Sequence, residues 1–387
     1  MHYSSRMSHL PDIKPREFDP NAPFEIFLVA TPGLEAALRA EAAALGFSNP
    51  RQVEGGVTMS GHWPEVWRAN LELRGASRVL ARFASFRAMH LAQLDKRARK
   101  LPWAALLRPD VPVAVEASCR KSKIYHAGAA AQRVATAIRE ELGATVVDKA
   151  PLTVMARIED DLVTISVDTS GELLHKRGHK EAVNRAPMRE TMAALFLSQC
   201  GYTGDEPVLD PMCGSGTFVI EAAEIAAGLQ AGRSRTFAFE QLASFDRAKW
   251  EALRTTARRE PTVRFYGSDR DAGAIEMSKA NAERAGVTGL TEFRQLPVGE
   301  LERPAGPPGL VIVNPPFGTR IGESASLGPL YRSLGSVLRE RFSGWRVGLI
   351  TTELGLARAT ALPFLPNGAP VLHGGLRVTL YRTDVLA

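Results

Sequence analysis

The chain has 387 residues, which at about 150 residues per domain predicts two or three domains with a substantial core. Hydrophobic residues make up 45% and charged residues 23%, and these ordinary values exclude a chain that is disordered or fibrous throughout. The net charge of +6 favours a polyanionic partner, and nucleic acid is the first candidate.

The cysteines and the N-terminus indicate the compartment. Cys119, Cys200 and Cys213 lie far apart without C-x-x-C spacing, so neither a disulfide framework nor a zinc site is encoded. Residues 1–23 are polar and rich in proline, without the apolar core of a signal peptide, and no run approaches the roughly 20 apolar residues of a membrane span. We expect a disordered tail on a cytoplasmic, monomeric protein with no membrane segment and no bound metal.

The N-terminal half predicts two small α+β modules that sit side by side, residues 24–88 and 89–170. The first combines expected strands at Phe24–Val29, Val53–Met59 and Arg78–Phe86 with helices that end near Gly46 and begin at Pro64. The second combines expected strands at Val111–Ala117, Leu152–Ile158 and Leu162–Asp168 with a helix at Ala127–Leu142.

Residues 171–189 lack a clear periodicity, which predicts a linker. In residues 190–387, expected helices alternate with apolar strands. That alternation is typical of an α/β domain, a doubly wound parallel sheet with helices on both faces. Its expected strands are Pro207–Asp210, Val263–Ser268, Leu290–Gln295, Leu310–Asn314, Val347–Thr351, Pro370–His373 and Leu376–Arg382.

Basic residues are concentrated between Ala81 and Lys123, where ten Lys and Arg face three Asp and Glu. Scattered charges usually form a solvated surface, but this clustering favours contacts with phosphates. The candidate RNA contacts are Lys96, Arg97, Arg99, Lys100, Arg120, Lys121 and Lys123, joined by Lys176 and Arg177 in the linker. His175 and His179 are spaced as helical metal ligands, but no third ligand accompanies them.

A glycine loop follows the first strand of the C-terminal domain, in the strand–loop–helix context where doubly wound sheets bind nucleotides. Val219 stands where a dinucleotide motif needs its third glycine, and no Gly-Lys-Ser/Thr closes a phosphate loop. Asp210 at the end of the strand suits a ligand that carries an ammonium and a sulfonium, so S-adenosylmethionine is the predicted cofactor. Its candidate ligands here are Asp210, Met212, Cys213, Gly214, Ser215, Gly216 and Thr217.

The next strand ends in Ser268 and Asp269, which places a carboxylate where it can accept the hydroxyls of an adenosine ribose. Capping of the following helix is the competing role for Asp269. Asp269 lies 55 residues after Gly214, against about 20 in a compact dinucleotide fold, so an inserted helical segment at about Gly228–Arg259 is expected.

The fourth strand runs into Asn314, Pro315, Pro316 and Phe317, which suit catalysis on a planar amine. Such an amine is a poor nucleophile, because its lone pair is delocalised into the ring. The Asn314 oxygen and the Pro315 carbonyl could accept its two N–H bonds while Phe317 stacks on the ring. A proline-rich turn without function is the competing interpretation.

Together these motifs resemble the THUMP-containing class I RNA methyltransferases that modify guanine N2. The resemblance rests on Asp210–Thr217, Gly267–Asp269, Asn314–Gly318, Asp168–Gly178 and Ala186–Glu190. It implies a ferredoxin-like domain at 24–88, an RNA-binding THUMP domain at 89–170 and a Rossmann-like methyltransferase domain at 190–387. It also implies S-adenosylmethionine as cofactor and a structured RNA as partner. One departure is Gln295-Leu296-Pro297, where such enzymes usually place Asp or Asn against the adenine, and Gln295 is the substitute.

Several alternatives stay open. A pyrimidine C5 methyltransferase needs a cysteine nucleophile in the substrate pocket, and Cys213 lies on the cofactor loop instead. Adenine-N6 DNA methylation and protein glutamine methylation share the Asn-Pro-Pro-aromatic element, but the basic N-terminal half favours RNA. An inactive RNA-binding module is the alternative from another class. The sequence leaves ribosomal RNA, the favoured substrate, and transfer RNA both open.

Overall fold

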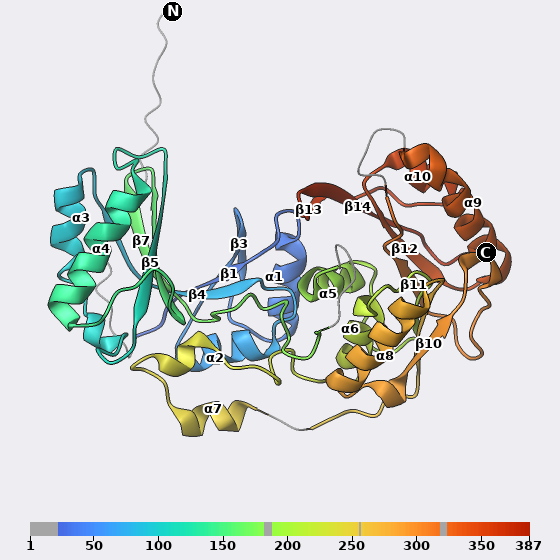
Figure 1. Cartoon of the computed structure of the whole chain (residues 1–387), viewed down its shortest axis with the longest axis horizontal. Coiled ribbons are helices and arrows are strands. Elements are labelled where there is room, and N and C mark those ends of the chain that lie inside the picture. Colours follow the sequence, from blue (N-terminus) through green and yellow to red (C-terminus); the bar gives the residue numbers. More distant parts are fainter. Residues whose placement is uncertain (1–21, 182–187, 255–256, 318–322) are drawn as a thin grey trace, which may run out of the picture.

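The computed structural model describes residues 22–181, 188–254, 257–317 and 323–387, and its two sheets lie along one long axis (Figure 1). The first sheet has the strand order β2-β3-β1-β4-β7-β6-β5. Its strands are β1 Phe24–Val29, β2 Arg51–Val53, β3 Gly56–Gly61, β4 Arg78–Arg87, β5 Val113–Arg120, β6 Leu152–Glu159 and β7 Leu162–Asp168. The accompanying helices are α1 Glu35–Ala44, α2 Trp63–Glu72, α3 Leu91–Ala98, η1 Trp103–Ala105 and α4 Ala127–Leu142.

The two N-terminal modules share this sheet, because β4 of the first pairs antiparallel with β7 of the second from Leu80↔Asp168 to Arg87↔Leu162. The two modules were expected to lie side by side. The structure shows in addition that their strands are hydrogen-bonded into one sheet. One element was predicted wrongly. The expected single strand at Val53–Met59 is a hairpin of β2 and β3, because Gly55 takes a left-handed backbone conformation with φ of 77° between them.

The second sheet has the order β10-β9-β8-β11-β12-β14-β13, with β8 to β12 parallel and β14 antiparallel. Its strands are β8 Val208–Asp210, β9 Phe265–Asp269, β10 Thr291–Gln295, β11 Leu310–Val313, β12 Arg346–Thr351, β13 Val371–His373 and β14 Leu376–Arg382. Its helices are α5 Glu190–Gln199, α6 Thr217–Ala226, η2 Ala238–Gln241, α7 Arg247–Leu253, α8 Ala272–Ala285, η3 Thr288–Leu290, η4 Val298–Glu300, α9 Glu323–Arg341 and α10 Leu354–Ala359. The predicted α/β class is confirmed.

Helices cover both faces of the second sheet: α5, α6 and α8 lie on the side of the N-terminal half, and α9 and α10 on the other (Figure 1). One apolar core runs from the first sheet through α5 and α6, and a second core lies under α9. The four residues of β11 are all buried, as expected of a central strand between two helical layers.

Residues 228–254 form an arm that leaves the second domain after α6 and packs against the first sheet's domain. The expected insertion at about Gly228–Arg259 is present, but its described part is helical only in η2 and the seven-residue α7. The arm is held by aromatic contacts instead: the ring of Phe239 lies 6.1 Å from Trp67 in α2 and 5.0 Å from Trp250. Its backbone also bonds to the N-terminal half, through Gly232 N to Leu71 O (2.8 Å) and Ala243 N to Leu106 O (3.0 Å).

A buried ionic cluster joins three parts of the chain. Arg74, which follows α2, and Arg177 of the linker both bond to Glu221 Oε1 in α6, at 2.8 and 3.0 Å. Arg177 also donates to the carbonyl of Arg74 (2.9 Å), and Glu224 in the next turn of α6 pairs with Arg74 at 3.4 Å. Burial alone would raise the pKa of Glu221, but the attraction of Arg177 and Arg74 lowers it below its ordinary value.

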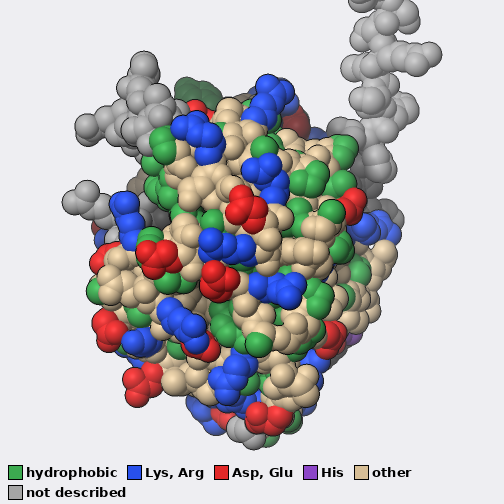
Figure 2. Space-filling view, turned by 90° about the vertical axis from the view of Figure 1, so that its right-hand side faces the viewer, with side chains coloured by type: hydrophobic (Ala, Val, Ile, Leu, Met, Phe, Trp, Pro, Cys, Tyr) green, Lys and Arg blue, Asp and Glu red, His purple; other side chains and the backbone are tan. Residues whose placement is uncertain are grey.

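Figure 2 shows the outer end of the second domain, where Lys and Arg alternate with Asp and Glu. The visible face therefore does not present the uniform charge of a phosphate-binding surface. Within the described residues, the helices are too short or too polar to cross a membrane.

The ionic cluster predicts the effect of neutralising Glu221. A Glu221→Gln variant should lower the free energy of unfolding by about 3–5 kcal/mol, because it leaves the buried Arg177 without a carboxylate and Arg74 with Glu224 alone. Denaturant unfolding followed by tryptophan fluorescence measures this, with Glu251→Gln on the surface of α7 as a control that should shift by under about 0.5 kcal/mol. Equal unfolding midpoints for the two variants would contradict a stabilising role of the cluster.

Candidate active site

The residues singled out from the sequence meet at one edge of the second sheet. Asp210 lies beside Gly267 in the register of β8 and β9, and Asp269 pairs with Gln295 in β9 and β10. Asn314 follows β11, which pairs in parallel with β8. These are the carboxyl ends of parallel strands, and the chain order reverses between β8 and β11, where open α/β sheets bind their ligands.

The glycine loop after β8 is tightly wound. Gly214 and Gly216 have φ angles of 54° and 83°, a left-handed conformation that glycine adopts without strain. A side chain at Gly216 would also approach Ser278 Oγ at 3.0 Å, whereas one at Gly214 would meet nothing within 4 Å. The loop is therefore closed on the side of α8 and open above Gly214, where a ligand can approach the backbone.

Two buried polar residues of α8 hold the loop from behind, and sequence reasoning missed both. Ser278 Oγ donates to Gly214 O (2.9 Å), and Asn281 Nδ2 donates to Ser215 O (3.0 Å). Both are fully buried, on the face of α8 that packs on α6. The sequence did contain an indication of this role, since two polar residues three positions apart occupy the otherwise apolar face of this helix.

The Asp269 carboxylate lies beside the glycine loop. Its Oδ2 accepts from Gly214 N at 3.0 Å, and its Oδ1 accepts from Asp271 N at 3.0 Å. The competing role as helix cap is wrong, because Asp271 caps α8 by accepting from Gly273 N. Each carboxylate oxygen has a second lone pair, so Asp269 can still accept hydroxyl donors.

Asp210 is buried at the bottom of the site. Its Oδ1 accepts from Met212 N at 3.0 Å. Burial, and more weakly the negative charge of Asp269, raises the pKa of Asp210 to about 8 despite that hydrogen bond. A cationic ligand group would reverse this effect, which makes Asp210 suited to an ammonium.

Asn314 carries a buried oxygen, Oδ1, that has no hydrogen-bond partner within the described residues. The segment is supported by Tyr331 of α9, whose hydroxyl lies 3.2 Å from Pro316 O and 3.3 Å from Thr351 Oγ1. Phe317 is half-buried and contacts both apolar cores, and Gly318 lies outside the described residues. An unpartnered buried acceptor is costly, so its presence points to a ligand donor.

The start of the cofactor-side helix α6 has a partner that the sequence did not reveal. Lys180 Nζ donates to Thr217 Oγ1 and pairs with Glu190 Oε1, both at 2.9 Å. This links the linker, α5 and the glycine loop. Arg185, Ala186 and Pro187, which belong to the same linker, lie outside the described residues.

The remaining candidate ligands differ in their exposure. Cys213 is buried, and burial raises the pKa of its thiol well above the ordinary value, so it is not poised as a nucleophile. Ser268 Oγ is buried without a partner among the described residues. Gln295 is exposed, and its Nε2 donates to Arg270 O at 3.1 Å, which leaves Oε1 as an acceptor.

The predicted RNA contacts fall into two groups. Arg99 pairs with Asp95, Glu140 and Glu141, and Arg120 pairs with Glu54 and Glu159. In contrast, the structure shows no carboxylate paired with Lys96, Arg97, Lys100, Lys121 or Lys123 within its described residues. Three of these line a cavity of about 490 Å³ on the domain of α3 and α4, together with Arg87, Met89 and Gln93.

Two of the predicted RNA contacts, Arg177 and Lys176, lie in the linker. The prediction for Arg177 is wrong, because its side chain is 1% exposed and belongs to the ionic cluster, where no phosphate can reach it. Lys176 is exposed and pairs with Glu172 at 2.9 Å.

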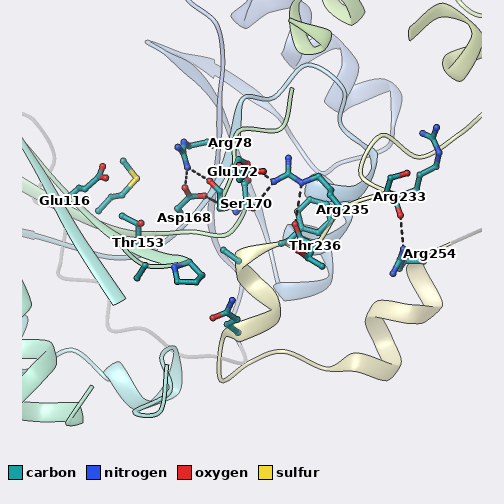
Figure 3. Close-up of a pocket in the computed structure, with 18 residues that line it drawn as sticks. Arg78, Glu116, Thr153, Asp168, Ser170, Glu172, Arg233, Arg235, Thr236 and Arg254 are labelled. Atoms are coloured by element: carbon teal, nitrogen blue, oxygen red, sulfur yellow. Dashed lines mark hydrogen bonds and ion pairs between the residues drawn. The ribbon is translucent and has the colours of Figure 1, made fainter. Parts of the chain in front are cut away.

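A larger polar cavity, of about 930 Å³, lies where β5, β6, the linker and the arm meet (Figure 3). Its arginines are occupied. Arg235 donates to four backbone carbonyls between Ser170 and Lys176, and Arg78 bonds to Asp168 and Gly171 O. These contacts tie the linker to the arm, so we assign this cavity to the domain junction.

The sheet order, the glycine loop and an Asn314 oxygen without a partner in the described ranges are typical of an α/β transferase of the class I methyltransferase type. Family comparisons agree with this class. The chain matches the RlmL ferredoxin-like domain at residues 25–80, the THUMP domain at 88–168 and the RMKL-like methyltransferase domain at 177–363.

This chain spans different shares of the length of two curated relatives. A Synechocystis sp. protein named "Putative RNA methyltransferase slr0064" is 30% identical over 93% of this chain and 96% of its own. "Ribosomal RNA large subunit methyltransferase K/L" of Psychromonas ingrahamii is 33% identical over 84% of this chain, which spans only 46% of that protein. The chain belongs to the RlmL-like family of THUMP-containing methyltransferases.

Two solved structures share the whole architecture. The structure described as a "predicted N6-adenine-specific DNA methylase" from Listeria monocytogenes is 31% identical with a TM-score of 0.84, and covers 94% of this chain and 96% of its own. SMU.472, described as a "putative methyltransferase complexed with SAH", is 25% identical with a TM-score of 0.85 and covers 95% and 99%. The prediction of S-adenosylmethionine as cofactor is confirmed by this membership.

The support from α8 can be tested by an Asn281→Ala variant. Losing the bond to Ser215 O should weaken binding of S-adenosylhomocysteine about fivefold, the effect of about 1 kcal/mol for one hydrogen bond that orders the loop. Isothermal titration calorimetry below the unfolding temperature measures it. Lys279→Ala, on the exposed side of the same helix, is the control and should bind as wild type. Unchanged affinity in folded Asn281→Ala would remove this residue from the site.

Proposed function

We propose that the chain transfers a methyl group from S-adenosylmethionine to the exocyclic N2 of a guanosine in structured RNA, most directly large-subunit ribosomal RNA. The observation that carries the chemistry is the buried Asn314 oxygen, which has no partner among the described residues and lies at the same sheet edge as the glycine loop. The relative named for ribosomal RNA supports the substrate, and the THUMP match supports RNA as the partner. The free state of all three cysteines fits a cytoplasmic protein.

One group of residues would bind the methyl donor, S-adenosylmethionine, and another would bind the methyl acceptor, the guanine. The cofactor supplies an electrophilic methyl group when bound. Asp210 would bind its ammonium, Asp269 its ribose hydroxyls, and the Gln295 Oε1 its adenine amine. The Gly214 and Gly216 backbone allows the close approach, with Met212, Cys213, Ser215, Thr217 and Ser268 lining the rest of the site.

The acceptor side is built on the segment after β11. Asn314 Oδ1 and the Pro315 carbonyl would each accept one N–H of the guanine amine and so orient its lone pair toward the methyl group. Phe317, anchored between the two cores, would stack on the ring, and Pro316 is fixed by Tyr331. The target base must leave its helix to reach them, which costs a few kcal/mol that contacts elsewhere must offset.

A transfer RNA guanosine is the alternative substrate with the same chemistry. The description of the Listeria structure favours a second candidate, adenine N6 in DNA, since an adenine amine also fits the Asn-Pro-Pro-Phe segment. The RNA-binding THUMP match favours RNA over DNA. An inactive binding protein is disfavoured, because Asp210, Asp269 and Asn314 are all in place.

Nucleoside analysis tests the proposal directly. The full chain, incubated with methyl-labelled S-adenosylmethionine and purified ribosomal or transfer RNA, should yield labelled N2-methylguanosine. Asn314→Ala should lower turnover by about 100-fold or more, on the order of 3 kcal/mol, while RNA affinity stays unchanged. Label in N6-methyladenosine, or wild-type turnover of the variant, would contradict the assignment.

The raised pKa of Asp210 predicts the pH dependence of cofactor binding. The free site holds this carboxyl protonated below about pH 8, so a ligand ammonium must displace a proton there. Affinity for S-adenosylhomocysteine should therefore rise with pH, by about tenfold per unit between pH 6 and 7, and level off above 8. Calorimetry across this range measures it. Asp210→Asn should bind weakly with little pH dependence, and a flat wild-type profile would contradict the role.

The two groups of basic residues predict different effects on RNA affinity. Replacing Lys96, Arg97 and Lys100 by Gln should flatten the slope of log affinity against log salt by about two to three units, since each phosphate contact contributes about 0.7–0.9. Replacing Arg99 and Arg120 should change it by less than one unit, because both are already ion-paired. Filter binding at several salt concentrations compares them. Equal slopes for the triple variant and the wild type would show that Lys96, Arg97 and Lys100 do not contact phosphates and are an ordinary solvated surface.

A further inference from the structure

Tyr125 is the most exposed large apolar side chain among the described residues, with 84% of its surface accessible. The next most exposed, Val385, reaches 62%. Single exposed apolar residues are common, but a nearly free aromatic ring on a basic domain is informative.

The segment that carries Tyr125 is fixed on both sides. Ile124 before it is 4% exposed, and the Lys123 amide donates to Asp161 Oδ1 at 2.7 Å. His126 after it caps α4 by accepting from the Ala129 amide at 3.0 Å. The ring is therefore presented by ordered backbone, so little conformational entropy is lost when a ligand contacts it.

The surroundings of the ring are positively charged. Lys121 and Lys123 are exposed, and Lys123 Nζ lies 3.5 Å from Met89 Sδ, which lines the basic cavity of Arg87, Lys96, Arg97 and Lys100. Of the carboxylates on this side, Asp161 accepts the Lys123 amide, Glu159 pairs with Arg120 and Arg157, and the charge of the exposed Asp160 acts on Arg120. Lys123 thus adjoins the cavity and stands two residues before Tyr125 in the same ordered segment.

We infer that Tyr125 is a stacking platform for an unpaired RNA nucleotide, with the phosphates of the adjoining strand held by Lys121, Lys123 and the basic cavity. The inference rests on the proposed RNA substrate and adds the class of RNA that this end of the molecule binds. A ring beside a cationic groove is the arrangement that binds single strands, because each base offers a face for stacking. Bases inside a duplex are stacked already and cannot use it.

The experiment compares two RNA hairpins of equal stem length, one blunt and one with a five-nucleotide single-stranded tail that contains 2-aminopurine. Fluorescence titration of the full-length protein reports both affinity and stacking. Tyr125→Ala should bind the tailed RNA about tenfold more weakly and lose the quenching of 2-aminopurine, with the blunt hairpin unaffected. Tyr125→Phe keeps the ring and should stay within about twofold of wild type. Val385→Ala, an exposed apolar residue on the other domain, is the control.

Wild-type binding of the tailed RNA by Tyr125→Ala would overturn the platform and favour a protein partner for the ring. So would an equal loss in Tyr125→Ala and Tyr125→Phe, or an equal loss on the blunt hairpin. Failure of the proposed reaction is distinguishable: wild-type protein would then yield no N2-methylguanosine, although the tail and the variants still behave as stated.

Discussion

The architecture depends on two buried guanidinium groups that share one carboxylate. Arg74 comes from the ferredoxin-like domain, Arg177 from the linker and Glu221 from the first helix after the glycine loop. Charges this deeply buried are stable only with their partners in place, so the three parts cannot separate without a large cost. The arm adds apolar contacts to the same joint through Phe239 and Trp67. The result is a single body with the THUMP helices α3 and α4 at one end and the catalytic sheet at the other (Figure 1).

We expect these contacts to hold the two ends at a fixed spacing, which has a mechanistic consequence. Under the proposed function, an RNA held by its phosphates at the THUMP end would reach the catalytic site only with nucleotides at a matching distance, so distance and direction would contribute to selection of the target. Phosphate contacts carry no sequence information, which makes this geometric selection valuable. The same contacts can offset the cost of extracting the base from its helix.

The active site holds polar groups that the protein itself leaves unmatched. The Asn314 oxygen lacks a donor within the described residues, and Asp210 is buried with one backbone hydrogen bond. Both are unfavourable in the free protein and would be satisfied by ligand groups of the right chemistry. The supporting residues Ser278, Asn281 and Tyr331 fix the backbone around them, so the site is formed before its ligands arrive.

Much of this was predictable from the sequence, for identifiable reasons. The strands of the second sheet were predictable, because each is an apolar run, and three of these runs lead into Asp210, Asp269 and Asn314. The shared first sheet was not, since pairing of β4 with β7 is a long-range choice that no local pattern encodes. The burial of Arg177 was missed for the same reason, because a charged residue in a linker looks exposed until Glu221 is placed beside it. The arm is less helical than expected, because its stabilising contacts lie on another domain.

The fixed spacing of the two ends is tested most directly by distance measurement between spin labels. Labels at the exposed positions Gln132 in α4 and Glu283 in α8, introduced as cysteines in a Cys119→Ser background, span the joint. Pulsed electron spin resonance should give one narrow distance distribution that stays the same when RNA and S-adenosylhomocysteine are added. A broad or bimodal distribution, or a shift on adding RNA, would contradict the single rigid body.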